Sequence, residues 1–174
     1  MKPIKITLKR AYIYYDVENI AYNVGLNRNT GENFEQVANI QNKGEAEDRD
    51  FVRRSVDAAF NRLKRNVNRF LTSETATSSN VIATASNQVA LEAALKTYDE
   101  GDYVLEFKMP ENYNLAAVDS VKNAAHDFIV SSALYDWFTA AKPDEIAIYA
   151  ARKSAANTNL LSALYRKKAP TRPA

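Results

Sequence analysis

The single histidine of the chain is the first residue whose chemistry could mark a reaction centre. His126 stands next to Asp127 in a stretch with helical periodicity. Adjacent positions of a helix point in different directions, so Asp127 cannot hold the imidazole of His126 for proton transfer. A metal site would need several ligands, and the chain has no cysteine. We interpret His126 as a core or interface residue, with a catalytic or metal-binding role as the alternative.

An acidic run could form a cation site. It comprises Glu45, Glu47, Asp48 and Asp50, whose spacing lacks the central glycine and terminal glutamate of an EF-hand loop. We interpret these carboxylates as the solvated start of a helix. The chain also lacks a glycine-rich phosphate loop and a nucleophile–base signature. The sequence therefore predicts no catalytic residue, no metal, no cofactor and no enzymatic activity.

Basic side chains are concentrated between Asp48 and Leu71, where seven basic residues outnumber three acidic ones and give a net charge of +4. One interpretation is contact with DNA phosphates, which would make binding depend on salt. A second is pairing with acidic residues of a neighbouring subunit, and a third is simple solvation. The candidate residues for a DNA or intersubunit face are Arg54, Arg62, Arg65 and Arg69.

The C-terminal segment is basic and contains Pro170 and Pro173, which cannot continue a helix. We predict that residues 168–174 form an extended arm that becomes ordered when it docks on a neighbour. A frayed end is the alternative. The candidate residues for this assembly interface are Tyr165, Arg166, Lys167, Lys168 and Arg172.

Tyrosines are frequent near the N-terminus, at positions 12, 14, 15 and 22. Helical spacing places Tyr15 and Tyr22 near one face and Tyr14 near another. Tyrosine combines a large apolar area with a polar tip, which suits core and interface packing. Stacking on nucleic-acid bases is the alternative.

The elements that must position these residues follow from hydrophobic periodicity. Alternating apolar and polar residues predict strands at Ile4–Leu8 and Tyr103–Met109, which we expect to pair with each other. Gly25 follows the last apolar position of the first predicted helix and is expected to end it. Helices are predicted over Ala11–Val24, Asp48–Leu71, Asn114–Ala141 and Asp144–Lys167. Trp137 is expected to fill the junction between the last two helices. Residues 27–47 are predicted to form a loop with a helical turn at 34–40. The polar stretch 72–79 is predicted to be a flexible loop or a segment ordered only by a partner, while 81–95 fits either helix or strand.

The predicted fold is therefore mainly α, a bundle of about four helices with a small β element from the N-terminal strand and strand 103–109. At 174 residues the chain fits one domain, predicted over residues 1–167. The net charge of +2 does not by itself indicate nucleic acid. No signal peptide and no apolar stretch of ~20 residues is present, so we expect a soluble protein made in the cytoplasm.

The C-terminal half resembles small virion proteins of tailed bacteriophages and prophages of gut Bacteroidales. The resemblance covers about residues 102–174 by motif and residues 1–71 by layout. Trp137 and the terminal tail together are its most distinctive features. The motifs that carry it are Pro110-Glu111-Asn112-Tyr113, His126-Asp127-Phe128-Ile129-Val130, Leu134-Tyr135-Asp136-Trp137-Phe138, Lys142-Pro143-Asp144-Glu145 and the tail from Leu164 to Pro173.

This resemblance implies a structural subunit of the virion, similar to head–tail connector proteins of the neck. It implies an oligomeric ring of roughly 12 copies beneath a portal, with portal, neck and tail proteins as partners. Non-specific contact with packaged DNA is possible in such a ring, and no membrane is involved. Two alternatives stay open: a tail-completion or terminator protein of the same virion, or a small DNA-binding accessory protein that uses the basic helix 48–71.

Overall fold

The computed structural model describes residues 1–26, 46–72, 101–141 and 143–168. These contain the strands β1 (Lys2–Lys9) and β2 (Asp102–Met109) and the helices α1 (Arg10–Leu26), α3 (Ala46–Asn66), α6 (Val118–Ala141) and α7 (Ile146–Leu164). The described residues thus confirm a mainly α bundle with a small β element. The predicted features within 27–45 and 73–100 lie outside the described residues.

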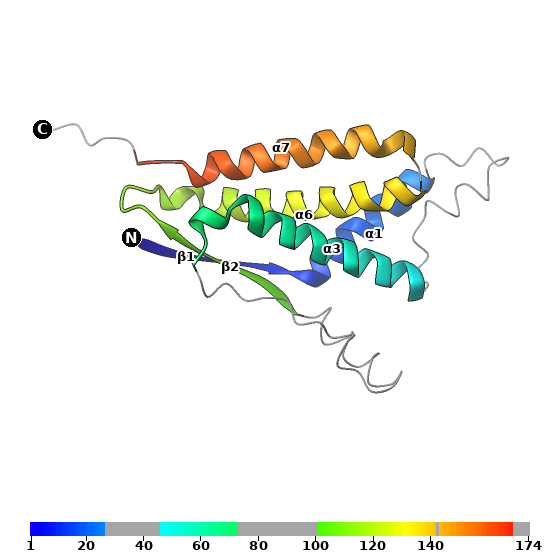
Figure 1. The fold of residues 1–174 in the computed structure, drawn as a ribbon, viewed down its shortest axis with the longest axis horizontal. Helices are drawn as coiled ribbons and strands as arrows, with labels where there is room; N and C mark the ends of the chain where they lie inside the picture. Colours follow the sequence, from blue (N-terminus) through cyan, green and yellow to red (C-terminus); the bar gives the residue numbers. More distant parts are fainter. Residues whose placement is uncertain (27–45, 73–100, 142, 169–174) are drawn as a thin grey trace, which may run out of the picture.

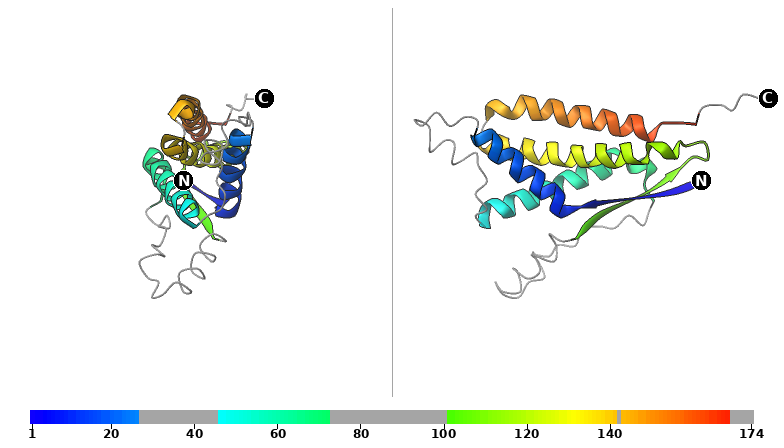
Figure 2. Two further views of the ribbon diagram at one scale, coloured as in Figure 1. Left: turned by 90° about the vertical axis from the view of Figure 1, so that its right-hand side faces the viewer. Right: turned by 180° about the vertical axis from the view of Figure 1, so that it is seen from behind.

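Helix α6 is the centre of the molecule, in contact with α7, α3, α1 and β1 (Figures 1 and 2). Every residue from Phe128 to Leu134 is buried. Seven consecutive residues span about two turns, so this part of α6 is buried on all sides. No charged residue interrupts the segment, as expected for a helix enclosed by other elements.

The two strands pair in antiparallel order, as predicted, with Ile6 opposite Leu105 and Leu8 opposite Tyr103. Successive side chains of a strand point to opposite faces, which explains the alternating sequence. One face of β2 buries Tyr103, Leu105, Phe107 and Met109 in the core. Phe60 of α3 stacks on the ring of Tyr103, with 4.2 Å between ring centroids, and joins this helix to the sheet.

Two predicted helix ends are corrected in the N-terminal half. Helix α1 continues through the buried Gly25 to Leu26, so this glycine does not end it. Helix α3 ends at Asn66 and not at Leu71, and a short 3-10 helix, Asn68–Phe70, follows. The chain then straightens because the Thr72 N–H donates to the Glu106 carbonyl at 2.8 Å. Pairing with β2 thereby replaces the last predicted turn.

The ends of α7 also differ from the prediction, which ran from Asp144 to Lys167. A 3-10 helix, Pro143–Glu145, precedes α7, so both acidic residues lie before its first turn. At the other end α7 stops at Leu164, because the following residues turn away to pair with residues 112–114. The start of α6 also differs from the predicted Asn114: α6 begins at Val118, after a 3-10 helix, Leu115–Ala117, which the Asn114 side chain caps by accepting the Ala116 N–H at 3.1 Å.

Trp137 is buried, but its aromatic neighbour is Phe51 of α3. The two rings meet edge to face with centroids 5.7 Å apart. At the junction between α6 and α7, where Trp137 was expected, Phe138 stacks on Tyr149 at 4.7 Å. Consecutive aromatic residues of α6 therefore pack against two different helices.

Replacing Trp137 by alanine should lower the free energy of unfolding by about 3–5 kcal/mol, because the substitution leaves a large cavity between α6 and α3. Tyr15→Ala removes a side chain that is 66% exposed and should change stability by at most ~0.5 kcal/mol. Urea denaturation followed by circular dichroism measures both. Equal losses for the two variants would contradict the burial of Trp137.

Candidate functional site

The C-terminal residues Arg166–Lys168 run in extended form against the turn that follows β2. Tyr113 and Lys167 form an antiparallel bridge. On either side of it, the Asn114 N–H donates to the Arg166 carbonyl at 3.0 Å and the Lys168 N–H donates to the Asn112 carbonyl at 2.7 Å. These bonds use main-chain atoms alone, so they fix the backbone while the basic side chains point outward.

Tyr113 anchors this pairing in the core. Its ring is buried, and its hydroxyl donates to the Ala163 carbonyl of α7 at 3.3 Å. Burial raises the pKa of the Tyr113 hydroxyl above its ordinary value, while the nearby positive charge of Arg166 acts in the opposite direction. Tyr113 therefore stays neutral and donates its hydrogen bond throughout the physiological pH range.

Two of the predicted surfaces meet beside this segment. Tyr165 packs edge to face on Phe70, with centroids 5.3 Å apart. The Arg69 guanidinium lies 4.9 Å from the centre of the Tyr165 ring and 5.0 Å from that of Phe70. Such cation–π contacts position the charge while leaving it accessible to solvent. Arg69 was predicted for the DNA or intersubunit face and Tyr165 for the C-terminal assembly interface. The structure brings these two side chains into contact.

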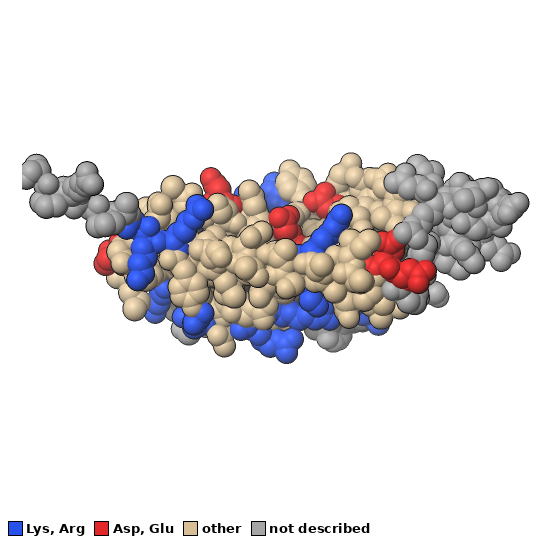
Figure 3. Space-filling view, turned by 90° about the horizontal axis from the view of Figure 1, so that it is seen from above, with Lys and Arg blue, Asp and Glu red and all other residues tan. Residues whose placement is uncertain are grey.

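We call Arg69, Arg166, Lys167 and Lys168 the basic end. All four side chains are exposed, and Figure 3 shows Lys and Arg gathered at the end of the molecule where α7 finishes. A cluster of exposed cations attracts acidic protein surfaces and phosphates through a field that is screened by salt. Arg172 and the rest of the predicted arm from residue 169 lie outside the described residues.

The arginines of α3 fall into two groups, those paired with carboxylates and those that are exposed, which the sequence did not indicate. Arg62 Nη1 lies 2.9 Å from Asp136 Oδ2 of α6, in a partly buried ion pair that joins the two helices. Arg53 pairs with Asp50 at 3.1 Å, so this carboxylate of the acidic run neutralises a neighbour. Arg54 and Arg65 are exposed and have no ion-pair partner in the described parts of the chain.

The N-terminal tyrosines divide as helical spacing predicted. Tyr14 is buried in the core, whereas Tyr12, Tyr15 and Tyr22 are 63, 66 and 48% exposed. Lys9 lies 5.5 Å from the centre of the Tyr12 ring. The exposed rings give α1 an aromatic outer face, on which Tyr12 borders the groove next to β1.

Sequence reasoning missed the partner of His126. Its Nε2 lies 2.8 Å from Asp16 Oδ2, and this partly exposed contact ties α6 to α1. The prediction that Asp127 does not hold the ring agrees with this geometry. Asp16 and His126 are 110 positions apart in the chain, so local spacing gives no sign of the pair.

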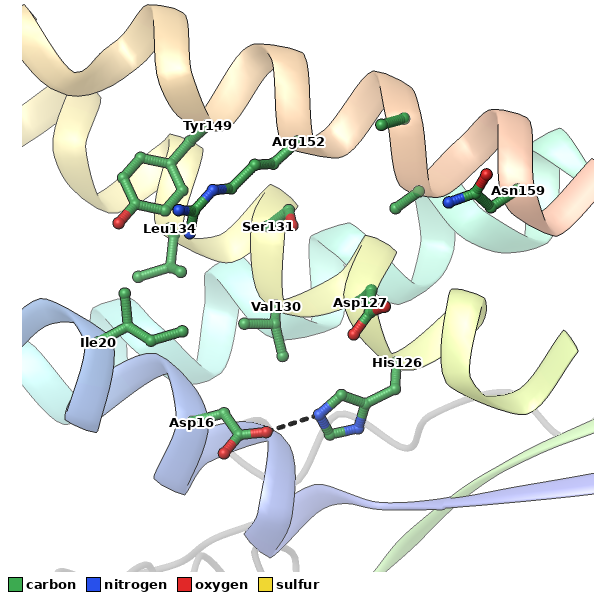
Figure 4. Close-up of a pocket in the computed structure, with 12 residues that line it drawn as sticks. Asp16, Ile20, His126, Asp127, Val130, Ser131, Leu134, Tyr149, Arg152 and Asn159 are labelled. Atoms are coloured by element: carbon green, nitrogen blue, oxygen red, sulfur yellow. Dashed lines mark hydrogen bonds and ion pairs between the residues drawn. The ribbon is translucent and has the colours of Figure 1, made fainter. Parts of the chain in front are cut away.

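A groove of about 360 Å³ opens beside this pair, between α1, α6 and α7. Figure 4 shows Asp16 and His126 at one end of it and Tyr149 with Arg152 at the other. Ser131 lies on the α6 wall nearer to Arg152, and its hydroxyl does not point toward the imidazole. Ser131 and His126 are therefore not arranged as the serine and histidine of a catalytic triad are. A second groove, of about 410 Å³, shares His126 and Asp127 and extends to β1.

Comparison with known proteins gave no match: no family model, no curated protein and no solved structure matches the chain. In the described part of the chain, no three His, Asp or Glu side chains are grouped to hold a metal ion. None of the described helices is long and apolar enough to cross a membrane.

The Arg62–Asp136 ion pair can be tested with a double-mutant cycle. We expect Arg62→Ala and Asp136→Ala to show a coupling free energy of about 0.5–1 kcal/mol in urea denaturation, because both side chains are partly shielded from water. Arg54→Ala combined with Asp136→Ala provides the control, whose coupling should be near zero. Equal coupling in both cycles would contradict the assignment of Arg62 to a structural contact.

Proposed function

We propose that this chain is a structural subunit of a tailed-phage virion, working at the head–tail connection as part of an oligomeric ring. The observation that carries the proposal is the basic end, where Tyr165–Lys168 leaves the bundle along a fixed backbone path beside Arg69. The resemblance of residues 102–174 to phage virion proteins supplies the biological setting.

The geometry suits a docking function because the path of the segment is already ordered. The Tyr113–Lys167 bridge and its two flanking hydrogen bonds hold the main chain, so little ordering entropy is lost when these residues meet a partner. The charge favours an acidic surface on the partner. In a ring, each copy repeats this contact, and the effective concentration of neighbouring contacts strengthens the whole assembly.

The alternative of a DNA-binding accessory protein has less support from the geometry of α3. Arg62 is engaged by Asp136, and the Lys64 ammonium lies 4.9 Å from the centre of the Phe60 ring. Arg49, Arg54 and Arg65 are then the exposed cations of α3 that have no ion-pair partner among the described residues. Three phosphate contacts would make the slope of log K against log salt only about −3.

The basic end can be tested in particles. Arg166→Gln, Lys167→Gln and Lys168→Gln together should leave the folded monomer intact, because its tail pairing uses main-chain atoms. Incorporation into purified virions, measured by quantitative mass spectrometry, should fall at least about tenfold, which corresponds to ~1.4 kcal/mol of lost binding. Normal incorporation of the triple variant would refute docking through these side chains, and absence of the unmodified chain from particles would refute the virion role.

Binding to duplex DNA separates the two roles. In a gel-shift titration at physiological salt, we expect weak affinity that changes little when Arg54→Gln and Arg65→Gln are combined. The basic-end triple variant is the matched control, because it removes a similar amount of charge from a different surface. Tight binding that disappears only in the α3 variant would favour the DNA-binding accessory protein.

A further inference from the structure

The outer edge of β1 has the features of a strand-docking site. In an antiparallel pair, the peptide groups of alternate residues point toward the partner strand and away from it. The Arg10 N–H donates to the Gly101 carbonyl at 3.2 Å, so even-numbered residues of β1 face β2. The Glu106 carbonyl, opposite Lys5, points away to accept the Thr72 N–H. The peptide groups of Pro3, Lys5 and Thr7 therefore point outward.

This outer edge is open in the described structure. No described residue forms a hydrogen bond with the outward peptide groups of Lys5 and Thr7. Pro3 occupies an outward position, where its missing N–H breaks no bond with β2, as is usual for proline at a sheet edge. By contrast, β2 has partners on both sides, since Leu71 bridges to Phe107 on the side away from β1.

A groove runs directly beside this edge. It has a volume of about 410 Å³ and lies between β1 and the start of α1 on one side and α6 on the other. Its lining residues are Thr7, Leu8, Lys9 and Tyr12, and Lys122, Asn123, His126 and Asp127. Figure 2, seen from behind, shows β1 continuing directly into α1, which rises obliquely across α6. A third strand would lie ~4.8 Å from β1. Alternate side chains of that strand would then enter the groove, and the others would lie on the solvent face.

The charges at the edge select the kind of strand. Lys5 and Lys9 project from the solvent face of β1, where Lys5 Nζ lies 3.6 Å from Glu106 Oε1 in a largely exposed ion pair. Lys122 and Asp127 border the groove. A second copy of β1 would bring lysines close to lysines across the new pair, and such like-charge neighbours destabilise sheets. A strand with carboxylates at alternate positions would instead face Lys5 and Lys9 and place its other side chains toward Leu8 and the groove.

We propose that the open edge of β1 binds an extended segment of a partner protein, by strand addition, in which acidic residues alternate with apolar ones. Main-chain hydrogen bonds to Lys5 and Thr7 supply affinity, and the lysines and the groove supply selectivity. This surface is separate from the basic end and does not depend on the proposed virion role.

Amide hydrogen exchange tests the proposal with a defined probe, an eight-residue capped peptide of alternating valine and glutamate. With the peptide at about ten times its dissociation constant, exchange at Lys5 and Thr7 should slow about tenfold. The amides of Ile4, Ile6 and Leu8, already bonded to β2, serve as internal references. The same peptide with lysine in place of glutamate should give no protection. Absence of protection by the acidic peptide at ~1 mM would overturn the proposal.

Two variants locate the contact. Thr7→Pro removes an outward N–H without touching the pairing with β2 and should abolish binding, whereas Thr7→Ala keeps the N–H and should retain it. Lys122→Glu alters the groove without changing β1 and should weaken binding of the acidic peptide at least about fivefold. If Thr7→Pro does not fold, the Lys122→Glu result alone tests whether the peptide binds beside the groove. Binding that survives both changes would place the peptide elsewhere.

Self-association gives a different result. Protection of Lys5 and Thr7 that grows with protein concentration, without peptide, would identify a second copy as the occupant and overturn the proposal of a different partner protein.

Discussion

The structure depends on the enclosure of α6. Its residues from Phe128 to Leu134 are buried on all sides, and every other described helix packs against it. Burial of apolar surface is the main stabilising contribution to folding. Because α1, α3, α7 and β1 all contact α6, this helix is the main element that positions them relative to one another, with direct contacts such as Phe60 on Tyr103 in addition. The polar links from it to α3 and α1, at Asp136 and His126, lie at the margins of this packing and are partly exposed.

Local patterns were sufficient to predict the strands and most of each helix. The alternation from Tyr103 to Met109 gave the buried face of β2, and the apolar stripe of α3 gave its core positions. The helix ends were less predictable, because tertiary hydrogen bonds decide them: Thr72 leaves α3 to reach Glu106, and Arg166 leaves α7 to pair with Asn114. The ion pair of Arg62 and the partner of His126 were not predictable, since their partners lie 74 and 110 positions away in the chain.

The surface separates cations that hold the fold together from cations that are free to bind. Arg53 and Arg62 are engaged by carboxylates in partly buried contacts, while the basic end and Lys9 of β1 face solvent and Lys5 has only an exposed contact with Glu106 at 3.6 Å. Net charge alone could not make this distinction, because it counts both groups equally. Two proposed docking surfaces follow from the second group. At the basic end, the backbone hydrogen bonds are already made within the molecule, and the basic side chains are available to a partner. At the outer edge of β1, the backbone groups themselves are available. Both surfaces favour an acidic partner, but only the edge of β1 requires that the partner be an extended strand.

The register between β1 and β2 also has a consequence for the order of folding. Lys2 is aligned with Met109, so the first strand of the chain cannot complete its pairing until more than one hundred residues have left the ribosome. The hairpin of α6 and α7 instead joins neighbours in sequence, and such contacts close quickly. During synthesis, the N-terminal strand therefore stays without its β2 partner, and its apolar face without the core it packs into, until residues 102–109 have been made.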